Sequence, residues 1–239
     1  MRPKYIFFDM DGTLLPMDSG VFARTYFKVL TKKMLPYGYE PEDLIAGINA
    51  GITATQTNDG TRTNEELFWE YFAKTTGERV LSDRALFDEF YEIDFQRISS
   101  TCGYNPAAKM TVELCRELGY PVVIATEPIF PLCAMESRLR WSGVDPASVE
   151  LITSYETGHY CKPDLGYYRE ITNKLGVAPE ECVMVGNDVG EDMPAEELGM
   201  RVFLLTDCLI NKKNADINQW EHGGYAALQS WIRELDQGR

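Results

Sequence analysis

The chain has 239 residues, 44% of them hydrophobic, and a formal net charge of −14 at pH 7. This length and composition are typical of a globular protein with one large domain or two smaller ones. So acidic a surface repels nucleic acid and anionic lipid, which argues against a nucleic-acid-binding protein, and no apolar run is long enough to span a membrane.

The start of the chain and the cysteines indicate the compartment. The first apolar run, residues 5–8, is too short for the core of a signal peptide and ends at a carboxylate, so we expect a cytoplasmic protein. The six cysteines form no CxxC pair and the chain has only two histidines, which argues against a zinc site. We expect small buried thiols in a reducing compartment. The cysteines are Cys102, Cys115, Cys133, Cys161, Cys182 and Cys208.

The first predicted element is a strand at residues 4–8. Its sequence, KYIFF, is a short apolar run, typical of a strand that is buried on both faces. Two carboxylates, Asp9 and Asp11, follow it, and Gly12 then allows a sharp turn. Like charges at the end of a buried strand need a counter-charge, because a buried carboxylate pair must otherwise hold a proton.

Residues 16–104 show helical patterns and no convincing strand. Four helices are expected, at 19–35, 41–51, 64–77 and 82–98. Asn64 and Ser82 stand where N-caps are expected, with acidic residues in the first turn of each helix. Aromatic residues spaced for one helix face predict the core of a small bundle. We therefore predict an all-helical insertion directly after the first strand.

A polar loop at 56–64, QTNDGTRTN, lies within this insertion. Arg62 is its only cation, and it is a candidate contact for an anionic group of a substrate. The more usual role of such a residue is that of a solvated loop side chain.

After residue 104, short apolar runs alternate with helical patterns. Strands are expected at 121–126, 150–154, 182–186 and 201–206. Helices are expected at 105–119, 128–143, 163–176 and 191–199, and a last one at 225–235 with Trp231 turned inward. This alternation predicts an α/β fold with a doubly wound parallel sheet. We divide the chain into a core, residues 1–15 and 105–239, and a cap, residues 16–104.

Polar residues gather where the predicted strands end. Asp9 follows the first strand, Thr126 ends the second, and Asp188 and Asp192 follow the strand at 182–186, while Lys162 precedes a helix that leads into that strand. Each has an ordinary structural explanation as a cap, turn or loop residue. Taken together they favour a site, because ligands bind at the carboxyl edge of an open parallel sheet.

Oxygen ligands without nearby histidine or thiolate suit Mg²⁺, and Mg²⁺ beside a lysine makes a site for phosphate. One carboxylate could then attack phosphorus as a nucleophile. A second carboxylate, two residues further on, could give a proton to the leaving oxygen.

The chain resembles the haloacid dehalogenase superfamily. The resemblance rests on four motifs in that family's order: DMDGT at 9–13, Thr126 after a strand, Lys162 in KPD, and GNDVGED at 186–192. It implies a Rossmann-like core with a helical cap of the C1 type, inserted after the first motif. The branch it most resembles contains phosphatases and enzymes similar to β-phosphoglucomutase.

The resemblance also implies roles for individual residues. Asp9 would be the nucleophile that forms an aspartyl-phosphate, and Asp11 the general acid and then the base for water. Thr126 and Lys162 would hold the phosphoryl oxygens. The Mg²⁺ ligands would be Asp9, the backbone carbonyl of Asp11, and Asp188. Asp192 would act close to the metal.

Two residues of the motifs, Glu127 and Asp11, bear on which reaction of the family this chain catalyses. Where the family often has Asn after the motif-two Ser or Thr, this chain has Glu127, whose side chain we assign no role. Dehalogenases and phosphonatases of the family lack the second aspartate of the first motif, so Asp11 favours phosphoester chemistry.

The leading prediction is a Mg²⁺-dependent phosphatase acting on a small phosphorylated metabolite. The nearest alternative is a phosphomutase similar to β-phosphoglucomutase. A signalling receiver domain is disfavoured by the helical insertion and by an acidic pair so late in the chain. A non-catalytic binding protein is disfavoured because no motif residue is missing. We expect no nucleic-acid or membrane partner, and the sequence predicts no particular oligomeric state.

Overall fold

The structure is a computed structural model that describes residues 2–237. In this part of the chain six parallel strands form one sheet, in the order β3-β2-β1-β4-β5-β6. They are β1 Tyr5–Phe8, β2 Val122–Ile124, β3 Leu151–Ile152, β4 Cys182–Gly186, β5 Arg201–Leu205 and β6 Glu221–Gly223. The parallel α/β sheet predicted from the sequence is confirmed. Strand β6 was not predicted, because its three residues contain no apolar run.

The strand order places a switch point at β1. The chain adds β2 and β3 on one side of β1 and then returns to add β4 on the other side. In register, Phe8 pairs with Ile124 of β2 and with Val185 of β4. The residues that follow these three strands therefore meet at one edge, where open α/β sheets bind their ligands.

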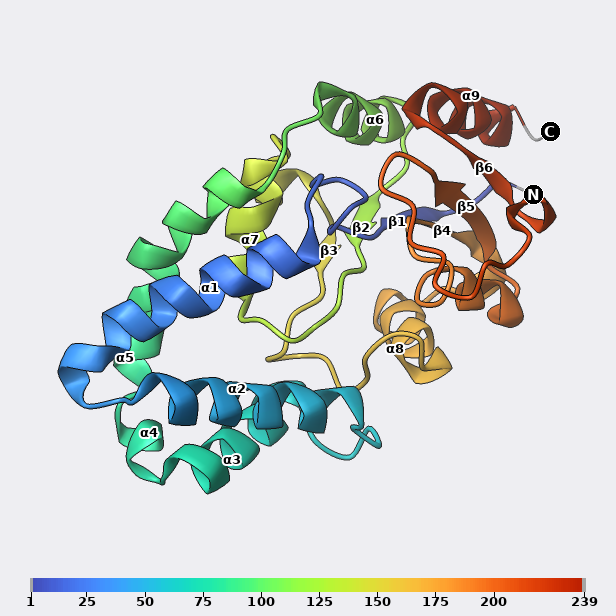
Figure 1. The fold of residues 1–239 in the computed structure, drawn as a ribbon. Coiled ribbons are helices and arrows are strands. Elements are labelled where there is room, and N and C mark those ends of the chain that lie inside the picture. The colour runs from blue at the N-terminus through green and yellow to red at the C-terminus, as the bar shows by residue number, and fades with distance from the viewer. Residues whose placement is uncertain (1, 238–239) are drawn as a thin grey trace.

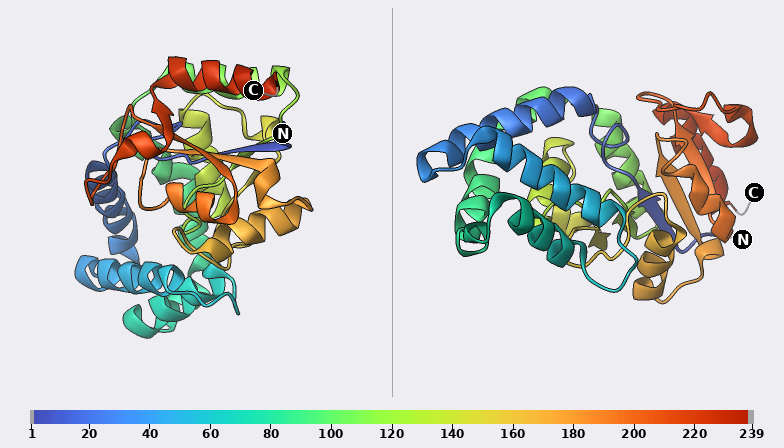
Figure 2. Two further views of the ribbon diagram at one scale, coloured as in Figure 1. Left: turned by 90° about the vertical axis from the view of Figure 1, so that its right-hand side faces the viewer. Right: turned by 60° about the horizontal axis from the view of Figure 1, so that its bottom comes forward.

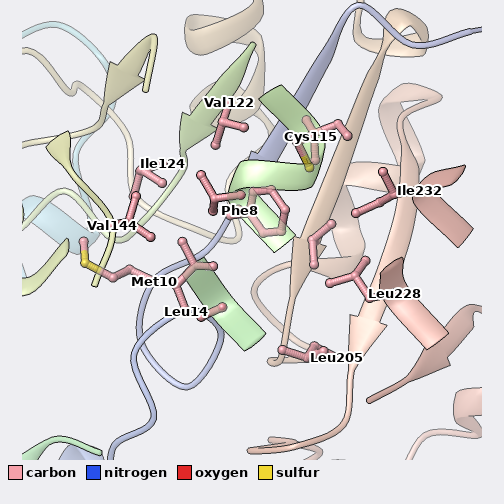
Figure 3. Close-up of a cluster of buried hydrophobic side chains, with 14 of the residues drawn as sticks. Phe8, Met10, Leu14, Cys115, Val122, Ile124, Val144, Leu205, Leu228 and Ile232 are labelled. Carbon is pink, nitrogen blue, oxygen red and sulfur yellow. The ribbon is translucent and has the colours of Figure 1, made fainter. Parts of the chain in front are cut away.

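Helices cover both faces of the sheet (Figure 1). Their bounds are α6 Pro106–Glu117, α7 Leu132–Trp141, α8 Leu165–Leu175 and α9 Tyr225–Asp236. Because side chains alternate along a strand, Ile6 and Phe8 pack with α6, α7 and α9, while Phe7 packs with α8 on the other face. Figure 3 shows Phe8 among residues of the first face, including Cys115 of α6 and Leu228 of α9.

The segment between β1 and α6 is helical, as predicted, and lies beside the sheet (Figures 1 and 2). Its α-helices are α1 Ser19–Met34, α2 Pro41–Gln56, α3 Asn64–Thr76, α4 Arg79–Ser82 and α5 Arg84–Glu89. Its buried aromatic side chains form a cluster that also includes Ala134 and Tyr155 from outside the segment. The division into a cap at 16–104 and a core remains our interpretation of this arrangement.

The last helix predicted in this segment, 82–98, is wrong as a single helix. Short helices α4 and α5 are followed by a π-helical turn, Phe90–Asp94, and a 3₁₀ helix, Phe95–Thr101. In a continuous α-helix, residues five apart point in clearly different directions, whereas the wider π turn brings Phe90 and Phe95 into the same buried cluster.

The expected N-caps are also corrected. Thr63, one residue before Asn64, caps α3 and forms a capping box with Glu66. Ser82 is the last residue of α4 rather than a cap, and α5 begins after Asp83. Helix α2 continues to Gln56, beyond its predicted end at residue 51.

Two features of the C-terminal part complete the fold. The helix predicted at 191–199 is instead a 3₁₀ helix, Met193–Leu198, because Pro194 lacks a backbone N–H and Gly199 ends the segment in a left-handed conformation. Trp231 of α9 turns inward as predicted, with its ring centroid 5.2 Å from that of Phe203. Within residues 2–237, none of the helices is both long and apolar enough to cross a membrane.

Candidate active site

Asp9 lies at the switch point, directly after β1. Its backbone N–H donates to the carbonyl of Val185, which extends the pairing of β1 with β4 by one residue. Its side chain is buried, with Oδ1 accepting from Lys162 Nζ at 2.7 Å and Oδ2 accepting from Thr13 Oγ1 at 3.1 Å. The carboxylate is therefore fixed at both oxygens.

Lys162 joins two of the predicted site residues. Its side chain is 1% exposed, and Nζ donates to Asp9 and to Asp192 Oδ1, each at 2.7 Å. Burial opposes the charge on this ammonium, but Asp192 and Asp9 outweigh it and raise the pKa of Lys162 well above its usual value. Burial also raises the pKa of Asp192 to about 7. Residues from three distant motifs thus meet around one ammonium.

Asp188 lies next to this cluster in the loop after β4. Its backbone N–H donates to Asp192 Oδ2 at 2.9 Å, and its own Oδ1 accepts the N–H groups of Gly190 and Glu191. Among the residues that the structure describes, the cation paired with Asp188 Oδ2 is the exposed Lys212, at 3.9 Å. Asp9, Asp188 and Asp192 are all buried, and the single buried ammonium among them leaves negative charge uncompensated.

Thr126 follows β2, beside Asp9. Its carbonyl accepts from Tyr167 Oη at 2.9 Å and from Thr153 Oγ1 at 2.6 Å, which fixes the backbone. Within residues 2–237 the hydroxyl of Thr126 makes no hydrogen bond of its own. The structure thus fixes the backbone of Thr126 and leaves its buried hydroxyl without a partner in this part of the chain.

Glu127 is turned toward the backbone near Lys162. Its Oε2 accepts from the backbone N–H of Lys162 at 3.1 Å, and its Oε1 is buried with no hydrogen-bond partner in the described chain. Burial, partly offset by Cys161 and Lys162, raises the pKa of Glu127 to about 7. A neutral Glu127 at neutral pH would reduce its repulsion of a phosphate nearby.

Asp11 is the candidate whose setting the sequence did not reveal. Its Oδ2 accepts from Nη2 of Arg138 in α7, and its Oδ1 is buried without a partner among the described residues. Burial raises the pKa of Asp11, Arg138 lowers it, and nearby Asp9 raises it. Arg138 could have been noticed in the sequence, because it falls on the face of a predicted helix otherwise occupied by Met135 and Leu139.

The turn after β1 is locked to the loop after β4. Gly12 has φ +77°, and Thr13 Oγ1 donates to Asn187 Oδ1 at 2.9 Å. Asn187 Nδ2 in turn donates to the carbonyl of Cys208 at 2.7 Å. The turn that carries Asp11 is therefore held against the loop that carries Asp188.

A cavity of about 210 Å³ opens beside this turn. Among the predicted catalytic residues, Asp11 is the one that lines it. The other lining residues come from the turn, the start of α1 and the loops after β4 and β5. The lining is Asp11, Gly12, Met17, Asp18, Ser19, Asn187, Cys208 and Ile210.

The donor set fits a hard divalent cation. The predicted ligands are oxygens of Asp9 and Asp188 and a backbone carbonyl, and oxygen atoms are the ligands that Mg²⁺ prefers. The buried carboxylates also carry negative charge that the buried lysine does not fully compensate. Among the residues that the structure describes, no group of three or more His, Cys, Asp or Glu side chains is arranged to hold a metal. The predicted set needs only two carboxylates, so it is compatible with that finding.

The Arg62 guanidinium is paired with carboxylates of its own helical segment. Its Nη1 donates to Glu70 Oε2, and its Nε is 4.0 Å from Glu66 Oε2. The guanidinium already contacts two carboxylates of α3. This disfavours Arg62 as a contact for an anionic group of a substrate.

A comparison with protein-family models finds a match over residues 3–196 to a model described as "Hydrolase: haloacid dehalogenase-like hydrolase". A search among curated proteins found no match.

Several solved structures share the fold. A 2-haloacid dehalogenase from Pseudomonas syringae pv. tomato DC3000 has a TM-score of 0.65 at 16% identity, covering 97% of this chain and 99% of that one. A predicted phosphoglycolate phosphatase from Haemophilus somnus 129PT has 0.57 at 16%, covering 97% and 98%. A hydrolase from Deinococcus radiodurans R1 with bound phosphate and sodium has 0.57 at 19%, covering 98% and 96%. At such identities the likeness establishes the fold and not the reaction.

Proposed function

Since the chain belongs to the haloacid dehalogenase-like hydrolase family, we propose that it is a Mg²⁺-dependent phosphatase acting on a small phosphorylated metabolite. The observation that carries this proposal is that the chain has Asp11 and places its carboxyl group at a cavity. Asp11 lines the cavity beside the turn after β1, two residues along the chain from Asp9, and a departing alkoxide would need its proton. The 210 Å³ cavity suits a small leaving group.

The same observation argues against dehalogenation. A halide leaves without a proton, so that reaction needs no acid, and the dehalogenases of the family lack the second aspartate. Here that aspartate is present, and its carboxyl group is paired with the buried guanidinium of Arg138. Arg138 is therefore not free to bind the carboxylate of a haloacid.

In the first half of the proposed reaction, the Asp9 carboxylate attacks phosphorus and the bond from phosphorus to the leaving oxygen breaks. Asp11 gives its proton to that oxygen, so that a neutral alcohol departs. The Thr126 hydroxyl and the Lys162 ammonium bind the oxygens of the transferred phosphoryl group.

In the second half, water attacks the phosphoryl group on Asp9 while the Asp11 carboxylate takes a proton from that water, which restores the acid for the next turnover. The bond between Asp9 and phosphorus breaks and phosphate leaves. Mg²⁺, held by Asp9, Asp188 and the backbone carbonyl of Asp11, would supply positive charge to the phosphoryl oxygens and offset the buried carboxylates. Asp192 holds Lys162 in place for both halves.

The proposal is tested by release of phosphate from nitrophenyl phosphate and from a set of small alkyl phosphates. We expect release with Mg²⁺, no release after chelation, and recovery when Mg²⁺ is returned. Asp9→Asn should abolish turnover, because the nearly isosteric amide removes only the nucleophile.

Two results would point elsewhere. Phosphate transferred within a sugar phosphate, with none released, would identify a phosphomutase. Chloride released from a 2-haloacid by a chain that leaves phosphate esters intact would contradict the proposal.

A further inference from the structure

We propose that Arg138 is a positioning residue, which holds the carboxyl group of Asp11 in the orientation from which it exchanges protons with the leaving group and with water. This inference rests on the proposed function, because that function gives Asp11 its role as acid and base.

The first argument is that Arg138 is the sole hydrogen-bond partner of the Asp11 side chain within residues 2–237. Asp11 Oδ2 accepts from Arg138 Nη2, and Oδ1 has no partner. Asp9 differs, because both of its carboxylate oxygens are held. The direction of the Asp11 carboxyl group therefore depends on a single contact.

The second argument is that the guanidinium is itself fixed. Arg138 lies in α7 with its side chain 2% exposed, and its Nη1 donates to Met135 Sδ at 3.4 Å. The rings of Phe22 and Phe130 lie on it, each centroid 5.3 Å from the guanidinium carbon. Phe22 comes from α1, so the contact to Asp11 is built partly by the helical segment outside the sheet.

The third argument is that stability alone gives little reason for this pair. Burying an arginine costs desolvation that an ion pair barely offsets, and apolar residues of similar size usually serve a core as well or better. The Nε of Arg138 is also buried without a partner in the described chain. The fold carries these costs at the predicted catalytic carboxyl group that lines the candidate cavity.

The test is a double-mutant cycle of Arg138→Met and Asp11→Asn, measured on an alkyl phosphate and on nitrophenyl phosphate. A misplaced acid slows a poor leaving group most, so Arg138→Met should lower the alkyl phosphate rate by about 10²-fold. The first chemical step on nitrophenyl phosphate should slow much less, because nitrophenolate barely needs a proton. In the Asp11→Asn background, Arg138→Met should change the alkyl phosphate rate by no more than about twofold.

Arg140→Met is the matched control. Arg140 lies two residues further along α7, exposed and paired with Glu136, and its loss should leave both rates unchanged. Urea denaturation shows whether each variant is folded at the assay temperature. If Arg138→Met does not fold, Arg138→Gln, which keeps an N–H donor, enters the same cycle with the same criteria.

The outcomes separate the two proposals. Equal slowing of both substrates, or an Arg138→Met effect that persists undiminished in the Asp11→Asn background, would overturn the positioning role while an active, Asp9-dependent enzyme upheld the proposed function. A folded wild-type protein without phosphatase activity would overturn both.

Discussion

At the scale of single residues, the site is defined by how its carboxyl groups are balanced. Asp9 and Asp192 share Lys162, and Asp11 has Arg138. Within residues 2–237, Glu127 has no cationic side chain bonded to it, and it accepts from the backbone N–H of Lys162 and interacts with the Cys161 thiol. Its charged form is therefore the least supported, and its titration should be visible in the stability of the protein.

Replacing Glu127 with Gln should change how stability depends on pH. Burial raises the pKa of Glu127 from 4.5 to about 7, so between these values the folded protein keeps a proton that the unfolded chain has lost. Its contribution to the free energy of unfolding therefore falls as pH rises through this window and is lowest above it. As pH rises from about 4.5 to about 8, the free energy of unfolding of Glu127→Gln should therefore increase by about 3 kcal/mol relative to that of wild type.

Urea denaturation at several pH values measures this gain. The exposed Glu113→Gln is the control, and its free energy of unfolding should stay within about 0.5 kcal/mol of wild type throughout. Parallel pH profiles for Glu127→Gln and wild type would show that Glu127 titrates normally.

At the scale of elements, the site depends on the turn after β1 lying against the loop after β4. Gly12 makes this approach possible in two ways. Its φ of +77° favours glycine, and a Cβ added there would lie 2.3 Å from Asn187 Nδ2. Asn187 cannot move aside freely, because its side chain bonds both Thr13 and the carbonyl of Cys208.

Gly12→Ala should therefore lower the free energy of unfolding by about 2–5 kcal/mol, from backbone strain and overpacking together, and should also lower turnover. Gly176→Ala is a matched control. Gly176 also has positive φ, +67°, but a Cβ there would meet nothing within 4 Å. It should cost only about 1–2 kcal/mol and leave turnover intact. Equal losses in stability and unchanged turnover in Gly12→Ala would contradict this view of the turn.

The sequence could predict the parts of the fold that rest on local patterns. Apolar runs marked β1, β2, β4 and β5, and the residues that follow such runs had to meet at one edge once the sheet was parallel. It could not predict β6, whose pairing with β5 is set by the sheet rather than by its own residues. The π turn was also hidden, because it depends on where Phe90 and Phe95 must reach in three dimensions.

The sequence also predicted the motif residues of the candidate site, but not every contact between them. Asp9, Lys162 and Asp192 belong to separate motifs, and the structure brings them into direct contact. Arg138 was not foreseen, because its partner Asp11 is 127 positions away in the chain and no local pattern links the two. Pairings of this kind require the tertiary structure.

At the scale of the whole molecule, two groups of helices act on one site. The first group packs on the sheet, whose strands β1, β2 and β4 end at the site. The second group includes α1, which begins at the cavity and whose Phe22 ring contacts Arg138. The net charge of −14 makes the surroundings unfavourable for a phosphate ester. Lys162 and the proposed Mg²⁺ would reverse that field locally, which explains why carboxylates gather there.

The central claim is that phosphate is carried on Asp9, and one measurement tests it most directly. Asp11→Asn enzyme is mixed rapidly with nitrophenyl phosphate and Mg²⁺, quenched in acid, digested and analysed by mass spectrometry. Loss of the base for water should slow the second half of the reaction by about 10²–10⁴-fold, so the phospho-enzyme should accumulate after a burst of nitrophenol. The account predicts one added phosphoryl group on the peptide that contains Asp9, and none in Asp9→Asn. A burst with no phosphoryl group on that peptide, or the group on another residue, would contradict it.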